Sequence, residues 1–379
     1  MPKEPSNPEY AAGADRSQHD VRHRDYGFAL VLSGGNALGA YQAGAYEALH
    51  DRGLEPDWIA GASAGAINGA VICGNRPDQR IARLESLWRT VGSGSERDPR
   101  ASGVMEEARR AGAALMTLAA GHPGMFVPRH LFGPWWNPFA NPEPSSLYDA
   151  TPLVGTIDRL VDFELLNQGP PRFSATAVDI ETGEDVCFDT RTHRLEMAHL
   201  RASSALLPVF SPVEVGGRLL GDAGISVNLP LDVVLSEAFE RPLLCIAVDL
   251  LPLRGPRPTS LGETVLRMQD LLFATQSRRA LAAWQAIFDE RVHRGMAGSV
   301  TILHVAYTDQ SSEVSGKAFD FSAKSAAARW RSGHADVADA ISELDGGRIE
   351  IGRPGLTVYT ATGSRGLKQV RWPIGPLRG

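Results

Sequence analysis

Short apolar runs alternate along this chain with longer segments in which apolar residues recur every three or four positions. Continuous apolar runs occur at 28–32 and 243–248, and the mainly apolar run at 300–306 is interrupted by Thr301 and His304. Such runs are typical of strands that are covered on both faces, as in a parallel sheet flanked by helices. The pattern therefore predicts an α/β fold with a mainly parallel central sheet.

Two segments alternate as hairpins rather than as buried parallel strands. One predicted hairpin joins 172–180 to 186–188 across a polar turn, and another joins 213–215 to 218–220 across two glycines. Gly and polar residues between alternating runs favour such turns. The second hairpin ends at Asp222, so the sequence predicts a carboxylate at the end of an apolar strand.

The composition changes along the chain and suggests its division. Residues 1–25 are polar, carry charges of both signs and lack the apolar core of a signal peptide. Residues 353–379 are basic and rich in Pro and Gly, and a long helical pattern begins at Leu261. The predicted segments are a disordered tail at 1–25, a main domain at 26–250, a helical extension packed on it at 251–352, and a flexible tail at 353–379.

Prolines and large apolar side chains gather without periodicity between residues 121 and 147. A long irregular segment of this kind usually carries function. It is interpreted either as a lid or acyl-chain wall, or as a loop packed over the core. The adjacent Trp135 and Trp136 could alternatively anchor the protein at a membrane interface.

One serine lies in a context that suits a nucleophile. Gly61-Ala62-Ser63-Ala64-Gly65 matches G-x-S-x-G between a short apolar strand and a helix of small residues. In such an elbow the serine occupies a strained turn, and the flanking glycines let the backbone pack closely. Ser63 is therefore the candidate nucleophile, placed where a helix N-terminus favours negative charge. The other interpretation is an ordinary tight strand-to-helix turn.

A glycine loop follows the first predicted strand. Gly34 and Gly35 precede Asn36, and Gly39 closes the loop before a helical segment. Backbone N–H groups of Gly35 and Asn36 can point into a site and stabilise an oxyanion, a large contribution in acyl transfer. The same loop partly resembles a dinucleotide-binding fingerprint, but Asn36 replaces its middle glycine, and no G-K-[ST] follows that would indicate a P-loop.

The loop and the serine motif together resemble those of patatin-like phospholipases. The similarity includes 33–44, 61–65 and a third block of three short stretches at 202–208, 221–224 and 228–230. It implies a three-layer α/β/α patatin-like domain over 26–250 and a Ser-Asp dyad made by Ser63 and Asp222. Segments around 319–344 resemble the C-terminal extension of one bacterial branch of the family.

The resemblance also assigns supporting roles and shows three departures. It implies an oxyanion hole at Gly34, Gly35 and Asn36, and motif positions at Gly39, Gly61, Gly65, Ala223 and Gly224. The departures are Asn36 for a third glycine, Leu38 for a basic residue, and Ala223 within the D-G-[GA] signature. Asn accepts positive φ better than most residues and keeps its N–H, so we expect the loop to function.

The implied reaction is ester hydrolysis through an acyl-enzyme, with Asp222 as the base. An aspartate can do this near neutral pH only if its pKa is raised, because a solvated one titrates near pH ~3.9. Alternatives are a Ser-His-Asp triad and a non-catalytic lipid-binding module. The triad would be completed by His293, His304 or His334, and Asp222 or Asp249 before His304 fits the usual order of acid and histidine. Asp179, Asp189 and Asp249 compete with Asp222 as the carboxylate of the site.

Charge and composition narrow the partners. The net charge is −6 and no apolar run is long enough for a transmembrane helix, which argues against nucleic acid and against a membrane span. Cys73, Cys187 and Cys245 lack metal spacing and are expected to be buried thiols in a reducing compartment. We therefore expect a protein that is cytoplasmic or peripheral to the membrane and needs no cofactor or metal. The resemblance implies a lipid or ester substrate, which the protein would reach by transient contact with a membrane surface.

Overall fold

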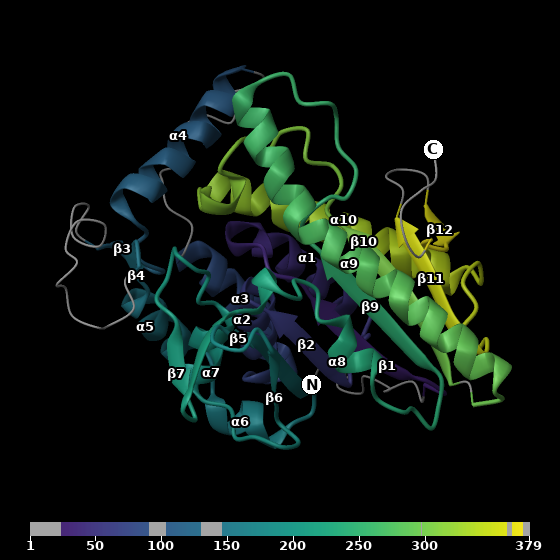
Figure 1. Cartoon of the computed structure of the whole chain (residues 1–379). Helices are drawn as coiled ribbons and strands as arrows, with labels where there is room; N and C mark the ends of the chain where they lie inside the picture. Colours follow the sequence, from purple (N-terminus) through teal and green to yellow (C-terminus); the bar gives the residue numbers. More distant parts are fainter. Residues whose placement is uncertain (1–23, 91–103, 130–145, 297, 362–365, 374–379) are drawn as a thin grey trace, which may run out of the picture.

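A mostly parallel sheet lies at the centre of the computed structural model, which describes residues 24–90, 104–129, 146–296, 298–361 and 366–373. Figure 1 shows helices on both sides of this sheet. Within the described ranges the strands follow, in order across the sheet, β12 (Leu367–Val370), β11 (Gly355–Ala361), β10 (Ser299–Ala306), β9 (Leu243–Asp249), β1 (Gly27–Leu32), β2 (Trp58–Ala62), β5 (Arg172–Asp179), β8 (Arg218–Asp222) and β7 (Val213–Val215), with β6 (Asp185–Asp189) also paired to β5.

Alternate residues of β1 point into two separate apolar cores. Leu30 and Leu32 belong to the larger core, whereas Ala29 and Val31 belong to the core on the opposite face. This is the two-sided burial that a continuous apolar run predicts, because successive side chains of a strand point to opposite faces. The three-layer α/β/α prediction is confirmed.

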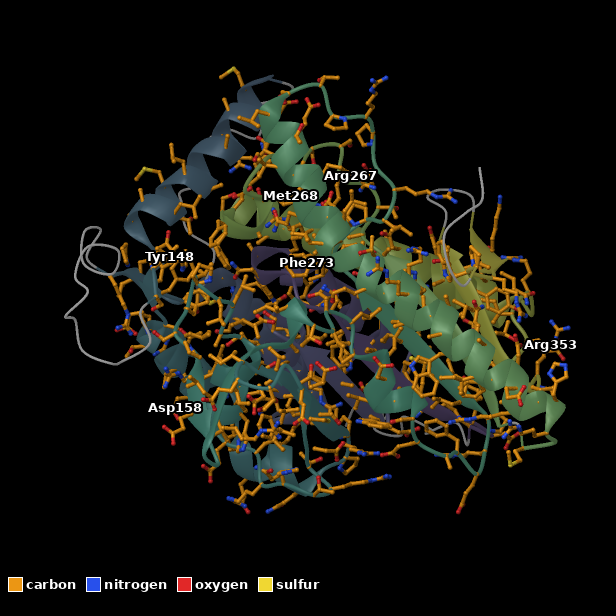
Figure 2. All side chains as sticks on the ribbon, viewed as in Figure 1. Tyr148, Asp158, Arg267, Met268, Phe273 and Arg353 are labelled. Carbon is orange, nitrogen blue, oxygen red and sulfur yellow. The ribbon has the colours of Figure 1, made fainter. Side chains whose placement is uncertain are left out.

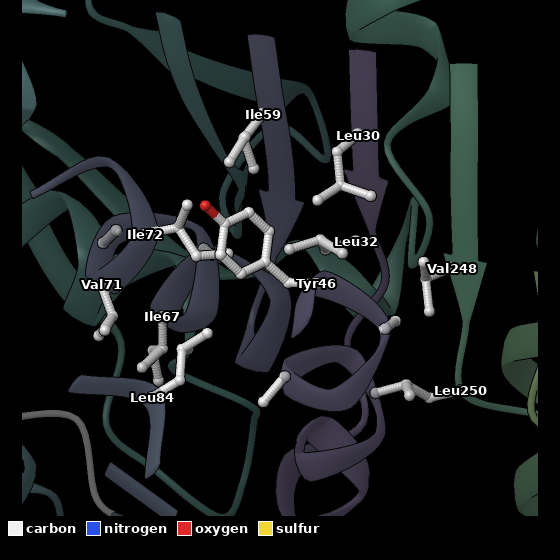
Figure 3. Close-up of a cluster of buried hydrophobic side chains, with 14 of the residues drawn as sticks. Leu30, Leu32, Tyr46, Ile59, Ile67, Val71, Ile72, Leu84, Val248 and Leu250 are labelled. Carbon is white, nitrogen blue, oxygen red and sulfur yellow. The ribbon is translucent and has the colours of Figure 1, made fainter. Parts of the chain in front are cut away.

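The two helical layers differ in size. Figure 3 shows part of the larger core, where Leu30 and Leu32 face Tyr46, Ile67 and Val71. This layer contains α1 (Ala40–His50), α2 (Ala64–Cys73), α3 (Pro77–Thr90), α5 (Thr151–Leu160), α6 (Phe163–Gln168), α7 (Met197–Ser203) and α10 (Ala323–Asp345). The opposite layer contains α8 (Leu231–Leu235) and the C-terminal half of α9 (Leu261–His293).

The remaining elements lie near the ends of the strands. They are α4 (Val104–Ala120), the two-stranded pair β3 (Val127–Pro128) and β4 (Tyr148–Asp149), and the short 3-10 helices η1 (Asn36–Gly39), η2 (Ala223–Ile225) and η3 (Lys317–Phe319). The predicted hairpins are confirmed, since β5 pairs antiparallel with β6 and β7 pairs antiparallel with β8.

The strand register brings the two candidate catalytic residues to one level. Ala62 of β2 is paired with Thr176 of β5, and the next residue of β5, Ala177, is paired with Asp222 of β8. Ser63 follows Ala62, so it and Asp222 stand on either side of β5 at the same end of the sheet.

The C-terminal region is part of the central sheet. β10 pairs parallel with β9, and β11 then pairs parallel with β10. The prediction of a flexible tail at 353–379 is wrong for its described part, because β11 and β12 extend the sheet there. The local Pro and Gly content suggested no regular structure, but pairing with β10 satisfies the backbone hydrogen-bonding groups of β11.

The prediction of three buried cysteines is wrong for one of them, and two other predictions concern residues that the structure does not describe. Cys73 and Cys245 are buried, but Cys187 is exposed. It lies on β6, which pairs with β5 and with no other strand of the described residues. The predicted N-terminal tail up to residue 23 and the pair Trp135 and Trp136 lie outside the described residues.

Candidate active site

Ser63 occupies a strained turn between β2 and α2. Its φ of 53° and ψ of −122° are unusual for a residue with a side chain. A Cβ at Gly61 would lie 2.5 Å from the carbonyl oxygen of Gly65, and one at Gly65 would lie 2.3 Å from the oxygen of Leu32. Both glycines are therefore required by close backbone packing, as a nucleophile elbow predicts.

The Ser63 backbone and side chain have separate partners. Its N–H donates to the hydroxyl of buried Ser203 at the end of α7, at 3.1 Å. Its side chain lies beside the carboxyl group of Asp222 and lowers the pKa of that acid. The side chain is thereby directed at a base while the backbone of the turn is fixed from the other side.

Asp222 is almost completely buried, with 2% of its surface exposed. Burial raises the pKa of Asp222 to about 6, and the nearby Ser63 side chain and the hydrogen bond from the Gly224 N–H only partly offset this. The Gly224 N–H lies 2.7 Å from the Asp222 Oδ1 atom. A carboxylate with this pKa is a far better base at neutral pH than a solvated one.

The glycine loop faces Ser63, but its amides are not equivalent. The N–H of Gly34 donates to the carbonyl of Asn228 at 3.0 Å, which removes it from the three expected oxyanion donors in this arrangement. Within the described part of the chain, Gly35 and Asn36 have no acceptor for their N–H groups. Asn36 adopts φ 52°, a value that asparagine accepts better than most residues.

Two further residues connect this loop to the aspartate and were not singled out from the sequence. The Asn228 side chain donates to the Gly34 carbonyl at 3.2 Å, and its N–H donates to Gln276 on α9 at 2.8 Å. Gln276 in turn donates to the carbonyl of Gly224 at 3.1 Å. Asn228 lay in a matched motif, whereas no local pattern marks Gln276.

A series of buried side-chain hydrogen bonds supports the residue that precedes the glycine loop. Trp88 Nε1 donates to Asn68 at 3.1 Å, Asn68 donates to Gln42 at 3.0 Å, and Gln42 donates to the carbonyl of Ser33 at 2.7 Å. All four side chains are buried. Because each of these buried polar groups has a partner, this series of hydrogen bonds can hold the loop rigidly.

Ser63, Asp222, Gly35 and Asn36 all line one cavity, which has room of about 100 Å³ for the centres of water molecules. The rest of its wall is mostly apolar and comes from distant parts of the chain. Examples are Ile67, Leu87, Phe126, Phe210, Phe273 and Phe319. Phe126 belongs to the segment predicted as an acyl-chain wall, and Phe273 and Phe319 belong to the C-terminal extension.

The histidines proposed for a triad lie elsewhere. His304 Nε2 lies 3.4 Å from Asp249, and its Nδ1 lies 2.8 Å from Thr360. His334 is paired with Asp51, and His293 is exposed at the end of α9. Among the described residues that line the cavity, none is a histidine.

The competing aspartates also have other partners. Asp179 forms an ion pair with Arg218 at 2.6 Å, and Asp189 forms one with Arg172 at 2.8 Å. Neither lines the cavity of Ser63. The structure therefore places Asp222, alone among the four candidates, beside the serine.

Within the described ranges, no group of three or more His, Cys, Asp or Glu side chains is arranged to hold a metal ion. In the same ranges, none of the helices has the length and apolar character needed to cross a bilayer.

This fold and site define a class of α/β proteins in which a serine on a strand-to-helix turn lies beside a buried carboxylate. The chain belongs to the patatin-like phospholipase family, because the model of that family matches residues 30–235. A second model, described as patatin phospholipase, matches residues 274–346. The resemblance noted in the sequence is thus confirmed.

Two similar proteins are described as uncharacterized NTE family proteins. NTE family proteins of Mycobacterium tuberculosis and Mycobacterium bovis are 28% identical over 262 residues, which cover 67% of this chain and 59% of theirs. The chain thus spans less than two thirds of the relatives' length. Among solved structures, VipD from Legionella pneumophila aligns over 85% of this chain and 67% of its own, with 14% identity and a TM-score of 0.42.

Proposed function

We propose that this chain is a serine lipid acyl hydrolase that uses a Ser63–Asp222 dyad. One observation carries the proposal: Ser63 shares a cavity with the buried carboxyl group of Asp222, whose pKa burial raises to about 6. Both residues line a mostly apolar cavity that also receives the loop of Gly35 and Asn36. A nucleophile, a base, oxyanion donors and a wall for an acyl chain are thus in one place.

The reaction would proceed in two balanced steps. Ser63 Oγ attacks the ester carbonyl while Asp222 takes its proton, and the N–H groups of Gly35 and Asn36 stabilise the oxyanion. The tetrahedral intermediate expels the alcohol, which receives the proton from Asp222, and leaves an acyl-enzyme. Asp222 then removes a proton from water, which attacks the acyl group, and the proton returns to Ser63 as the acid departs.

The cavity supports a substrate with an apolar acyl chain. Its apolar lining would bury several methylene groups, each contributing about 0.8 kcal/mol when removed from water. A phospholipid, a lysophospholipid, a neutral ester or a storage polyester would all present such a group. We therefore propose a medium or long acyl ester as the substrate class.

Exposed apolar side chains near the cavity support transient contact with a lipid surface. On α9, Met268 and Leu272 are 56% and 58% exposed, and they adjoin Gln269 and Phe273, which line the cavity. Figure 2 labels Met268 and Phe273 on this helix. Large exposed apolar groups beside a binding site are characteristic of interaction surfaces. We propose that this part of α9 faces the lipid.

A fluorophosphonate probe tests the proposed function. Wild-type protein should be labelled and Ser63→Ala should not, while the two proteins show the same thermal midpoint. Hydrolysis of p-nitrophenyl octanoate should disappear in the same variant. Failure of folded wild-type protein to react with either reagent would instead support the non-catalytic lipid-binding module.

A further inference from the structure

Arg329 of α10 lies beneath the glycine loop, far from it in sequence and completely buried. Its Nε and Nη2 atoms donate to the carboxylate of Glu313, each at 2.8 Å. Its Nη1 donates to the carbonyl of Asp320 at 2.7 Å and to the carbonyl of Ala37 in η1 at 3.1 Å. The guanidinium therefore joins the C-terminal extension to the short helix that begins at Asn36.

The guanidinium is itself held in place by its surroundings. Glu313 also accepts from the Tyr307 hydroxyl at 3.0 Å. The Arg329 Nη2 atom additionally donates to the carbonyl of Lys317 at 3.1 Å. A planar fork with this many fixed acceptors has little freedom, so it can hold the Ala37 carbonyl in one orientation.

The backbone that carries Arg329 is fixed against the helix that follows the loop. A Cβ at Gly333 of α10 would lie 1.9 Å from the Tyr41 carbonyl oxygen, and one at Gly44 of α1 would lie 1.9 Å from that of Trp330. The Tyr41 hydroxyl also donates to Asp336 at 2.6 Å. Arg329, Gly333 and Asp336 share one face of α10, because they are spaced by about one helical turn.

We propose that Arg329 is a positioning residue that sets the direction of the Gly35 and Asn36 amides through η1. Ala37 directly follows Asn36, and the Leu38 N–H donates to the Gly35 carbonyl at 3.1 Å, so η1 and the two amides move together. The C-terminal extension thereby completes the oxyanion hole of the proposed hydrolase, on which this inference rests. Arg329 contacts neither substrate nor nucleophile.

Arg329→Met and Arg110→Met form a matched pair for the test. Arg110 is buried, and it pairs with Glu313 and Glu106 in the same charged cluster without a bond to η1. Arg329→Met should lower kcat on p-nitrophenyl octanoate by about 10- to 100-fold with KM within about threefold, as expected for a displaced oxyanion donor. Arg110→Met should keep kcat within about threefold.

Two further measurements separate positioning from stability. A trifluoromethyl ketone forms an oxyanion on Ser63, so its affinity should fall in parallel with kcat in Arg329→Met and not in Arg110→Met. Arg329→Lys keeps the charge beside Glu313 but cannot reach Glu313 and Ala37 together, so it should lose kcat as well while keeping more of the wild-type stability.

Hydrogen exchange at residues 33–40 gives a readout that does not depend on turnover. Exchange should accelerate there in both Arg329 variants and stay at the wild-type rate in Arg110→Met. Equal kcat in the Arg329 and Arg110 variants, or unchanged exchange at 33–40, would overturn the inference. Absence of Ser63-dependent hydrolysis in the wild type would refute the proposed function, and the exchange result would still decide the role of Arg329.

Discussion

Replacing Asp222 by Asn removes the base and nearly preserves the shape of the side chain. In the wild type the pKa of about 6 means that about 90% of Asp222 is ionised at pH 7 and about 10% at pH 5. kcat/KM should therefore fall about tenfold for each pH unit below 6. In Asp222→Asn it should be lower by about 10²- to 10⁴-fold at pH 7 and lose this dependence.

The same substitution should change stability in a pH-dependent way. The folded pKa lies above the ordinary value of 3.8, so the native state binds the proton more tightly than the unfolded state. The ionised carboxylate therefore lowers the free energy of unfolding by its full amount above pH 6. Far below pH 4, where the group is protonated in both states, this effect is absent. A shift of about two units corresponds to about 3 kcal/mol, which Asn would recover at pH 8.

Urea unfolding at pH 4 and pH 8 measures this difference, and hydrolysis of a p-nitrophenyl ester between pH 4.5 and 8.5 measures the activity. Asp179→Asn is the control with the opposite sign, because its ion pair with Arg218 lowers the pKa of Asp179. That variant should lose stability at pH 7 and lose less in acid. Retained activity in Asp222→Asn, or no gain in stability at pH 8, would refute the assignment of Asp222 as a buried base.

Three other outcomes are expected. His304→Ala should keep activity within about threefold, because the ring nitrogens of His304 contact Asp249 and Thr360 and not Ser63. A loss as large as in Ser63→Ala would support the Ser-His-Asp triad instead. Gly333→Ala should lower stability by about 1–3 kcal/mol because its Cβ would meet the Tyr41 carbonyl, and an unchanged thermal midpoint would contradict the packing of α1 on α10. Initial rates on p-nitrophenyl esters should rise from acetyl to octanoyl, whereas equal rates would argue against an acyl-binding wall.

The sequence alone was sufficient for features whose causes are local. Gly61 and Gly65 beside Ser63 predicted the elbow, because a sharp turn needs residues without a Cβ. The apolar run at 28–32 predicted a strand buried on both faces, and the hairpin pattern predicted that Asp222 ends a strand. Each of these depends on neighbours within a few residues, which the sequence displays directly.

The tertiary structure decided whatever depends on distant partners. It showed that the Gly34 N–H is bound to Asn228, that Gln276 joins the loop to Gly224, and that β11 belongs to the sheet despite its Pro- and Gly-rich surroundings. The β-branched and aromatic residues at 357–360 were a signal for that strand, but the Pro- and Gly-rich composition around them favoured a flexible tail.

The electrostatics of the site likewise required the folded chain. The raised pKa of Asp222 results from burial by several elements, and Arg329 reaches Ala37 across 292 positions of sequence. Residue type and spacing indicate which side chains are candidates for catalysis, because they determine the local backbone conformation. Only long-range packing determines how far each group is removed from water, and therefore which proton it can hold.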